Sequence, residues 1–342
     1  MINKLDQERG GILVGRIIRG VGNFFDVYIE DGRFKDKIVR CNSKGIFRYA
    51  RDSIKPLVGD RVELELINKD VSDVVITDDN KDEALALIKS INTRRNYLVR
   101  PAVSNLDILF IVASVKSPAP AYYFIDKLTA CAFYNDIEPV IIANKIDLLD
   151  AGEACELYNI YKRTEFKTIK LSAVSDNAES EAGFAELRAE LRGRTCAFAG
   201  VSGAGKSSIL NRLFNNLDLK TGALSEKIER GRHTTRTVEL FRHDLDGFAA
   251  DTPGFSMLDF DYVNMQDRDI KESSREILKE ELMRVFPDLH EYGDEGRCKY
   301  RGCTHIKEDG CEVLAAVAAG KLAKSRHESY AQLYEQFRSK KT

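Results

Sequence analysis

Long apolar runs are missing from this sequence. None of its apolar stretches approaches the roughly 20 residues that a helix needs to cross a bilayer. The polar start, MINKLDQERGG, has no apolar core of the kind found in signal peptides. Internal repeats and low-complexity tracts are also missing. We therefore expect a cytoplasmic protein that does not bind membranes. A hydrophobic content of 43% over 342 residues predicts two or three globular domains.

Neither sign of charge is in excess. The chain has 52 Lys and Arg against 54 Asp and Glu, a formal net charge of -2. This balance argues against a uniformly basic coat for nucleic acid, but it leaves room for local basic clusters. Such clusters could contact RNA phosphates or simply face solvent. They are Arg94-Arg95-Arg100, Arg192-Arg194, Lys299-Arg301 and the RSKK tail.

The cysteines are few and unevenly placed. Four of the seven stand alone, at Cys41, Cys131, Cys155 and Cys196, as expected of small core residues in a reducing compartment. The other three share the segment CKYRGCTHIKEDGC with one histidine. Three thiolates and an imidazole make a closed tetrahedral site suited to one structural zinc ion, the alternative being cysteines merely clustered in a loop. The predicted zinc ligands are Cys298, Cys303, His305 and Cys311.

The first part of the chain has short segments of alternating polarity. GILVGRII, FFDVYIE, KIVRCN and RVELELI are separated by turn residues. This spacing predicts a small β-domain, and a five-strand OB-type barrel fits its length. The polar run DDNKDE, residues 78–83, is the best candidate for a linker.

Apolar strands and helices alternate from NLDILFIVASV onward. This rhythm predicts βαβ units and a doubly wound parallel sheet. Residues from about 266 are mainly of helical pattern. The expected fold class is therefore multidomain α/β.

The stretch GVSGAGKSS has the pattern G-x-x-x-x-G-K-[ST] between an apolar strand and a helix. Its glycines let backbone N–H groups face phosphates, and the helix N-terminus adds positive charge. We expect Lys206 to reach the β- and γ-phosphates and Ser207 to bind Mg²⁺; the alternative is a glycine-rich turn. The predicted nucleotide-binding residues here are Gly200, Val201, Ser202, Gly203, Ala204, Gly205, Lys206, Ser207 and Ser208.

DTPG ends an apolar strand about fifty residues later. By itself D-x-x-G is usually a turn. At this place we expect Asp251 to bind Mg²⁺, directly or through water, and Gly254 to lend its N–H to the γ-phosphate.

NKID, which comprises Asn144, Lys145, Ile146 and Asp147, indicates a guanine site. Asp147 can accept from both N1–H and the exocyclic amine of guanine, a pair that adenine does not offer. Lys145 can cover the base, and Asn144 can tie its loop to the phosphate loop. TIKLSAV supplies Ser172 and Ala173, the short loop that backs the guanine ring. The alternative is an ordinary polar turn.

The order of these motifs is a cyclic shift of the usual GTPase order. NKID and SA come first, and the phosphate loop, HTT and DTPG follow. We therefore predict a circularly permuted GTPase domain, which is tolerable because domain termini often lie close together on the surface.

The sequence resembles the bacterial small-subunit-dependent GTPases of the RsgA or YjeQ family. The resemblance rests on VGDRVEL, INTRRNYLVRPAVSNLD, the nucleotide motifs, GRHTT and the cysteine cluster. It implies a monomer that hydrolyses GTP to GDP on the 30S subunit in late assembly, with barrel and zinc segment contacting 16S rRNA. In GRHTT, either Thr234 or Thr235 would face Mg²⁺, and we expect Thr235. Arg236 stands where many members of the family have another threonine, which leaves the choice between the two open.

The expected domains are an OB-fold RNA-binding domain (1–80), the permuted GTPase domain (81–265) and a zinc-binding, helical C-terminal domain (266–342).

Phe255 stands where many GTPases have a water-orienting glutamine. We expect His233 to take that role and hydrolysis to be slow without a partner. The resemblance implies that the 30S subunit is the partner that speeds it. One alternative is a metabolic P-loop kinase. Others are an RNA-binding protein whose nucleotide site is vestigial and an RNA-binding assembly protein that uses GTP only as a conformational ligand.

Overall fold

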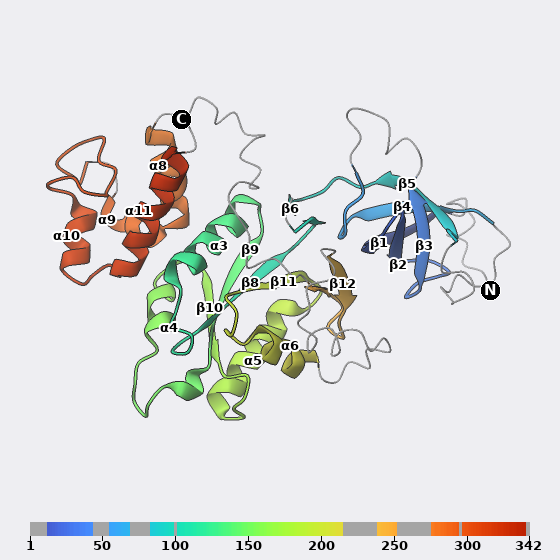
Figure 1. The fold of residues 1–342 in the computed structure, drawn as a ribbon, viewed down its shortest axis with the longest axis horizontal. Helices are drawn as coiled ribbons and strands as arrows, with labels where there is room; N and C mark the ends of the chain where they lie inside the picture. Colours follow the sequence, from blue (N-terminus) through green and yellow to red (C-terminus); the bar gives the residue numbers. More distant parts are fainter. Residues whose placement is uncertain are drawn as a thin grey trace.

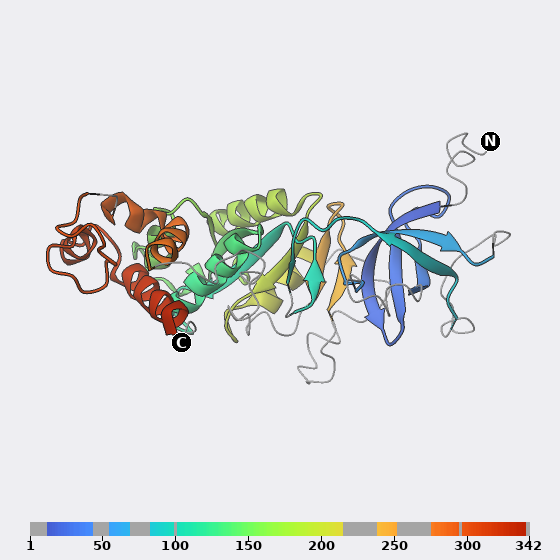
Figure 2. The same cartoon turned by 90° about the horizontal axis from the view of Figure 1, so that it is seen from above.

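The chain forms an elongated molecule of three parts. In the computed structural model, described residues are 12–43, 55–68, 83–98, 101–214, 238–251, 275–293 and 296–339. A β-barrel lies at one end, an α/β sheet in the middle and a group of helices at the other end (Figures 1 and 2). No helix within these ranges combines the length and the apolar composition needed for a transmembrane segment.

The barrel closes on itself. Its strand order is β1-β2-β3-β5-β4, and β4 pairs again with β1. Only the β3–β5 pair is parallel. Alternate residues point inward, as in β4, where Val62 and Leu64 are buried and Arg61 is exposed. The five-strand OB-type barrel is confirmed. Its strands are β1 (Ile12–Val21), β2 (Phe24–Ile29), β3 (Ile38–Ser43), β4 (Arg61–Leu66) and β5 (Ala86–Ile91).

The fifth strand lies further along the chain than the sequence patterns suggested. The run 78–83 falls between β4 and β5, which pair with each other, so it connects two barrel strands and not two domains. The expected boundary after residue 80 precedes β5.

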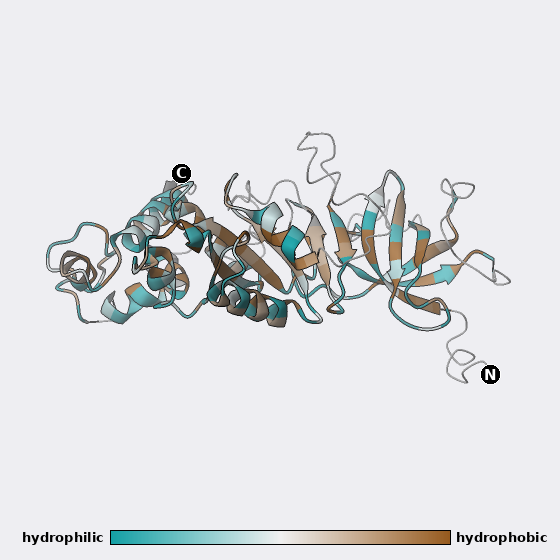
Figure 3. Ribbon diagram, turned by 90° about the horizontal axis from the view of Figure 1, so that it is seen from below, coloured by the Kyte–Doolittle hydropathy of each residue, from teal (hydrophilic) through white to brown (hydrophobic). Residues whose placement is uncertain are grey.

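The central sheet has the strand order β10-β9-β8-β11-β13-β12, in which only β12 is antiparallel to its neighbour. It is wound on both faces. Leu109 and Ile111 of β8 pack in one core with α3, while Phe110 and Val112 pack in another with α5 and α6. The elements are β8 (Ile108–Ser114), α3 (Tyr122–Tyr134), β9 (Glu138–Asn144), α4 (Glu156–Tyr161), β10 (Lys167–Leu171), α5 (Ala178–Leu191), β11 (Thr195–Ala199), α6 (Lys206–Phe214), β12 (Glu239–Arg242) and β13 (Phe248–Asp251). Hydrophobic colour follows these strands in Figure 3.

The barrel is joined to the edge of this sheet. Arg19 of β1 pairs with Glu239 of β12, so barrel and central strands form one 11-stranded sheet. Next to this pair, the Arg16 guanidinium lies 5.1 Å from the centroid of the Phe248 ring. Arg242 of β12 lies 5.0 Å from the ring of Tyr28 in β2. Stacked cations and aromatic rings therefore hold the joint.

The C-terminal helices pack on α3 around their own core, which includes Leu282, Phe286 and Tyr330. The helical pattern after residue 311 is not one helix, because Gly320, with a φ of 67°, turns the chain between α10 and α11. The helices are α8 (Arg275–Val285), α9 (Pro287–Gly293), α10 (Glu312–Ala318) and α11 (Lys324–Ser339).

A buried arginine joins these helices to the central part. Arg326 of α11 is fully buried, and its guanidinium forms a bidentate pair with Asp288 of α9, at 2.8 and 2.9 Å. It also pairs with the fully buried Asp126 of α3. Tyr161 of α4 donates to the same Asp126 carboxylate at 2.8 Å. Arg326 and Asp126 together thus connect four helices.

Candidate functional site

The phosphate loop requires its glycines. Gly200 has a φ of 150°, and a Cβ there would lie 2.2 Å from the carbonyl oxygen of Val112. Gly205 has a φ of 99°, and a Cβ there would lie 2.2 Å from the side-chain nitrogen Nδ2 of Asn144. Both positions combine a left-handed backbone with a contact too close for any side chain. The loop therefore fits tightly between β8 and the NKID segment.

Lys206 begins α6 and reaches back over its own loop. Its Nζ donates to the carbonyl oxygens of Gly200 at 2.7 Å and Val201 at 3.1 Å. Burial lowers the pKa of the Lys206 ammonium. The cation is thus held where the loop is predicted to bind phosphate. Ser207 is exposed in the first turn of α6.

The predicted motifs converge because the strands before them are parallel neighbours. NKID overlaps the end of β9, the SA loop follows β10, the phosphate loop follows β11, and Asp251 ends β13. Carboxyl ends of parallel strands meet at one edge of a sheet, and ligands bind there in open α/β folds. The topology therefore assembles one site from segments up to about a hundred residues apart.

Asn144 links the base side of this edge to the phosphate side. Its side chain is buried, donates to the Ala204 carbonyl at 2.8 Å, and accepts from the Ala173 amide at 3.2 Å. The same carboxamide thus connects the phosphate loop with the SA loop. Lys145, with a φ of 67°, donates to the Ser117 carbonyl at 2.6 Å.

The two guanine motifs also touch each other. Ser172 is fully buried, and its hydroxyl donates to the carboxylate of Asp147. Asp147 itself is exposed, while the neighbouring Ile146 is buried and anchors the loop. The carboxylate therefore stands at the surface with one oxygen already oriented by protein.

Arg212 belongs to this arrangement, although no sequence motif singled it out. It lies near the end of α6, and its Nη1 donates to the carbonyl oxygens of Ser172 at 3.0 Å and Ser175 at 2.6 Å. The contact depends on how the β10–α5 connection folds over α6. An arginine six positions after Lys206 carries no such signal in one sequence.

The cysteine cluster brings together four side chains that could hold a metal ion. The ligand atoms of Cys298, Cys303, His305 and Cys311 all lie within 4.8 Å of one another. His305 Nδ1 lies 3.6 Å from the sulfur of Cys298 and 3.5 Å from that of Cys311. Burial lowers the pKa of His305 to about 4, so its ring is neutral at pH 7. Burial also raises the pKa of Cys303 to about 12, so a metal must displace the thiol proton. This donor set can hold one metal ion.

The loop that carries these ligands is fixed by Glu308. Its carboxylate accepts from the backbone amides of Thr304 at 2.8 Å and Ile306 at 3.0 Å. Burial raises the pKa of Glu308, but hydrogen bonds, led by the one from the Thr304 hydroxyl, outweigh it and lower the pKa to about 2. An ionised carboxylate therefore organises the backbone around His305.

Comparison with known proteins identifies the family. The model described as RsgA GTPase matches residues 91–261, and that of the RsgA N-terminal domain matches residues 14–74. The chain belongs to the RsgA GTPase family. Relatives named small ribosomal subunit biogenesis GTPase RsgA include one from Caldanaerobacter subterraneus subsp. tengcongensis, 37% identical over 95% of this chain and 96% of its own length. The Bacillus subtilis relative is 34% identical over 96% of this chain and 98% of its own.

Two solved structures share the whole architecture. YjeQ from Thermotoga maritima matches with a TM-score of 0.66 and 29% identity, covering 95% of this chain and 98% of that one. YloQ, described as a circularly permuted GTPase, matches with the same TM-score and identity over 97% of each chain. The circular permutation predicted from motif order is thus confirmed, and β11, late in the chain, occupies the middle of the RsgA sheet.

Part of the predicted RsgA site lies outside the described residues. His233, Thr234, Thr235, Gly254 and Phe255 all fall there. Asp251 is described only as the last residue of β13, without its side chain.

The first basic cluster is largely engaged within the protein. Arg94 pairs with both oxygens of the fully buried Asp60, at 2.7 and 2.8 Å, and its side chain is only 14% exposed. Ser104 donates to the same carboxylate at 2.6 Å. Arg95 pairs with Asp107 at 2.7 Å. Arg94 is therefore neither solvated nor available to a phosphate, and it joins the barrel to the segment before β8. Arg100 lies outside the described residues.

Two other basic clusters each contain one residue that forms an ion pair. Arg194 pairs with Glu138 at 2.8 Å and with Glu190 at 3.2 Å. Lys299 pairs with Asp309 at 3.0 Å. Exposed pairs such as these contribute little stability.

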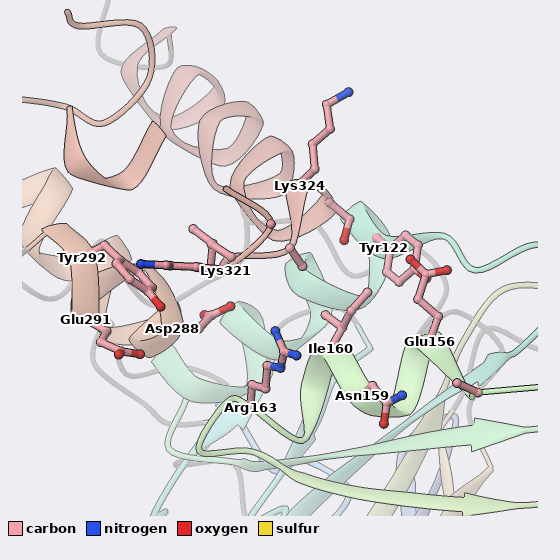
Figure 4. A pocket seen from close by; sticks show the side chains of 15 residues that line it. Tyr122, Glu156, Asn159, Ile160, Arg163, Asp288, Glu291, Tyr292, Lys321 and Lys324 are labelled. Atoms are coloured by element: carbon pink, nitrogen blue, oxygen red, sulfur yellow. The ribbon is translucent and has the colours of Figure 1, made fainter. Parts of the chain in front are cut away.

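A pocket of about 770 Å³ lies away from the nucleotide edge. It separates α3 and α4 from α9 and the turn before α11 (Figure 4). Arg163 and Lys321 extend into it from opposite sides, beside Asp288 and Tyr292. Its lining includes no residue predicted to bind nucleotide or metal, so this pocket is separate from the predicted GTP site.

Proposed function

We propose that this chain binds the small ribosomal subunit and hydrolyses GTP to GDP and phosphate as a checkpoint in late subunit assembly. The observation that carries the proposal is the single sheet edge at which Asn144 connects the phosphate loop to the SA loop. The names of the full-length relatives support the ribosomal partner.

The nucleotide site would divide its work between two ends. Asp147 would accept from guanine, with Lys145 over the base. Lys206 would neutralise the β- and γ-phosphates. Mg²⁺ supplied with GTP would be held by Ser207, Asp251 and Thr235 or Thr234, and it would offset charge on the same phosphates. His233 would orient the attacking water.

The metal ion of the cysteine cluster would be structural Zn²⁺. Three sulfur ligands and one imidazole leave no open position, so the ion would stabilise its loop and perform no chemistry. The buried, fixed geometry around His305 supports this proposal.

We place the end of the barrel domain after β5, at residue 91, where the GTPase family model begins. The GTPase domain would follow to about residue 265, and the zinc-binding helical domain would complete the chain. The barrel and zinc domains lie at opposite ends of the molecule (Figure 1). Both could contact 16S rRNA while the GTPase domain sits between them, in a cytoplasmic monomer.

The deciding experiment is the GTP hydrolysis rate with and without purified 30S subunits. We expect strong stimulation by 30S subunits, none by 50S subunits, and loss of nucleotide binding in Lys206→Ala. If 30S subunits bind the GTP form but leave the rate unchanged, GTP serves only as a conformational ligand. If 30S affinity does not fall as salt rises, protein contacts and not phosphates dominate the docking.

A further inference from the structure

Arg212 connects the phosphate-loop helix to the loop behind the predicted guanine site. Besides its two bonds to the Ser172 and Ser175 carbonyls, its guanidinium lies 4.4 Å from the centroid of the buried Phe184 ring. The stacking sets the plane of the guanidinium, and the side chain is only 16% exposed. Pairs with Asp176 and Glu181 complete its environment. Those carboxylates are 91% and 54% exposed, so the carbonyl bonds matter more than the charges.

Ser172 is held from three directions. Its amide donates to the Ser180 hydroxyl at 3.1 Å, its carbonyl accepts from Arg212, and its own hydroxyl donates to Asp147. The guanidinium is therefore one residue removed from the carboxylate that would read the base. A shift of the Ser172 backbone would move the hydroxyl that orients that carboxylate.

An exposed carboxylate needs such support. Asp147 must meet two donors of one planar ring at once, which requires both its position and its rotation to be fixed before binding. Asn144 already connects the two loops at the phosphate-loop end. Arg212 adds a second connection at the far end of the SA loop, from the helix that Lys206 begins. With two connections, the base-reading and phosphate-binding ends keep a constant separation.

We propose that Arg212 is a positioning residue for guanine selection. It fixes the SA loop relative to α6, and through Ser172 it sets the Asp147 carboxylate at a constant distance from the phosphate loop. The inference rests on the proposed function, because it takes Asp147 as the group that reads guanine.

The test is the equilibrium affinity of Arg212→Met for GDP, IDP and ADP, measured by competition against a fluorescent GDP. IDP lacks the exocyclic amine, so the GDP-to-IDP affinity ratio reports one of the two contacts to Asp147. We expect the affinity for GDP to fall roughly tenfold, as for the loss of one charge-assisted contact. The affinity for IDP should fall less, and the affinity for ADP should stay unchanged. The matched control is Arg188→Met. Arg188 also lies over Phe184, at 5.8 Å, but belongs to α5.

Arg212→Lys is the second variant, and it keeps the charge and the apolar stem. One ammonium cannot reproduce two bonds and a stacked plane, so the same fall in the ratio is expected. Combining Arg212→Met with Ser172→Ala should give less than the sum of the two single effects. Parallel losses for GDP, IDP and ADP, or unchanged affinities, would overturn the inference. If Asp147→Asn also leaves base selectivity unchanged, the proposed guanine site itself fails; if only the Arg212 variants do, the site stands.

Discussion

Replacing Arg326 by methionine should weaken the attachment of the C-terminal helices more than any exposed substitution. The change keeps much of the apolar contact with Phe286, whose ring centroid lies 4.3 Å from the guanidinium. It removes the cation between Asp126 and Asp288, and Asp126 is fully buried. Removing one partner of a buried pair costs about 3–5 kcal/mol because the other charge stays uncompensated. Native domains are stable by only about 5–15 kcal/mol, so the loss is a large fraction.

The loss of stability in Arg326→Met should also change with pH in a definite direction. Burial raises the pKa of Asp126, and Arg326 is the largest influence that lowers it. Without the guanidinium, the pKa should rise further. A carboxyl with a raised pKa in the folded state loses stability as pH rises from its unfolded pKa through its folded one. The deficit of Arg326→Met should therefore be larger at pH 7 than at about pH 5.

The assay is urea unfolding followed by far-UV circular dichroism, because the chain has no tryptophan to report by fluorescence. We expect the Arg326→Met midpoint to fall by at least about 1 M. Arg338→Met is the control, since Arg338 lies on the same helix with its side chain 51% exposed. Adding Asp126→Asn should remove the extra pH dependence. A midpoint unchanged at pH 7, or a deficit that grows as pH falls, would refute the reasoning.

Three further predictions concern the proposed chemistry. Asp147→Asn should weaken GTP binding and favour xanthine nucleotides, whose donor pattern complements an amide; equal binding of ATP and GTP by the unmodified protein would contradict the base-reading role. Cys303→Ser should lower bound zinc from one ion per chain, measured by elemental analysis in reducing buffer, and should loosen the segment around it because metal binding and folding are coupled. His233→Ala should keep GTP and 30S affinity but lose roughly 10²–10⁴-fold of the 30S-stimulated turnover; an unchanged stimulated rate would assign the water to a ribosomal group.

Sequence reasoning succeeded where a motif fixes its own backbone. Gly200 and Gly205 permit conformations and contacts that no side chain allows, so their spacing signals a phosphate loop. The alternation of apolar strands and helices predicted the doubly wound central sheet. The barrel and the circular permutation also followed from strand pattern and motif order.

What the sequence did not reveal depends on distant partners. β5 follows a charged run that resembles a linker, and its place in the barrel is set by its pairing with β3 and β4. Arg212 and Arg326 look like ordinary charges on helix surfaces. Their importance arises only once Ser172 and Asp126 are brought beside them by other elements. Arg94 was expected to contact RNA or face solvent, because its partner Asp60 lies 34 positions away in the sequence.

The late position of β11 also has a consequence for synthesis on the ribosome. The strands that carry the base-reading loops, β9 and β10, are translated before β11, and the sheet keeps an open edge at β8 until β11 emerges. Asn144 then lacks one of its two partners, the Ala204 carbonyl. A nascent chain that ends after α5 contains NKID and SA, yet we expect it not to hold a guanine nucleotide. The joint between Arg19 and Glu239 must wait longer still, and such distant pairings form slowly. Attachment of the barrel to the sheet edge should therefore be among the last steps by which the newly made protein matures.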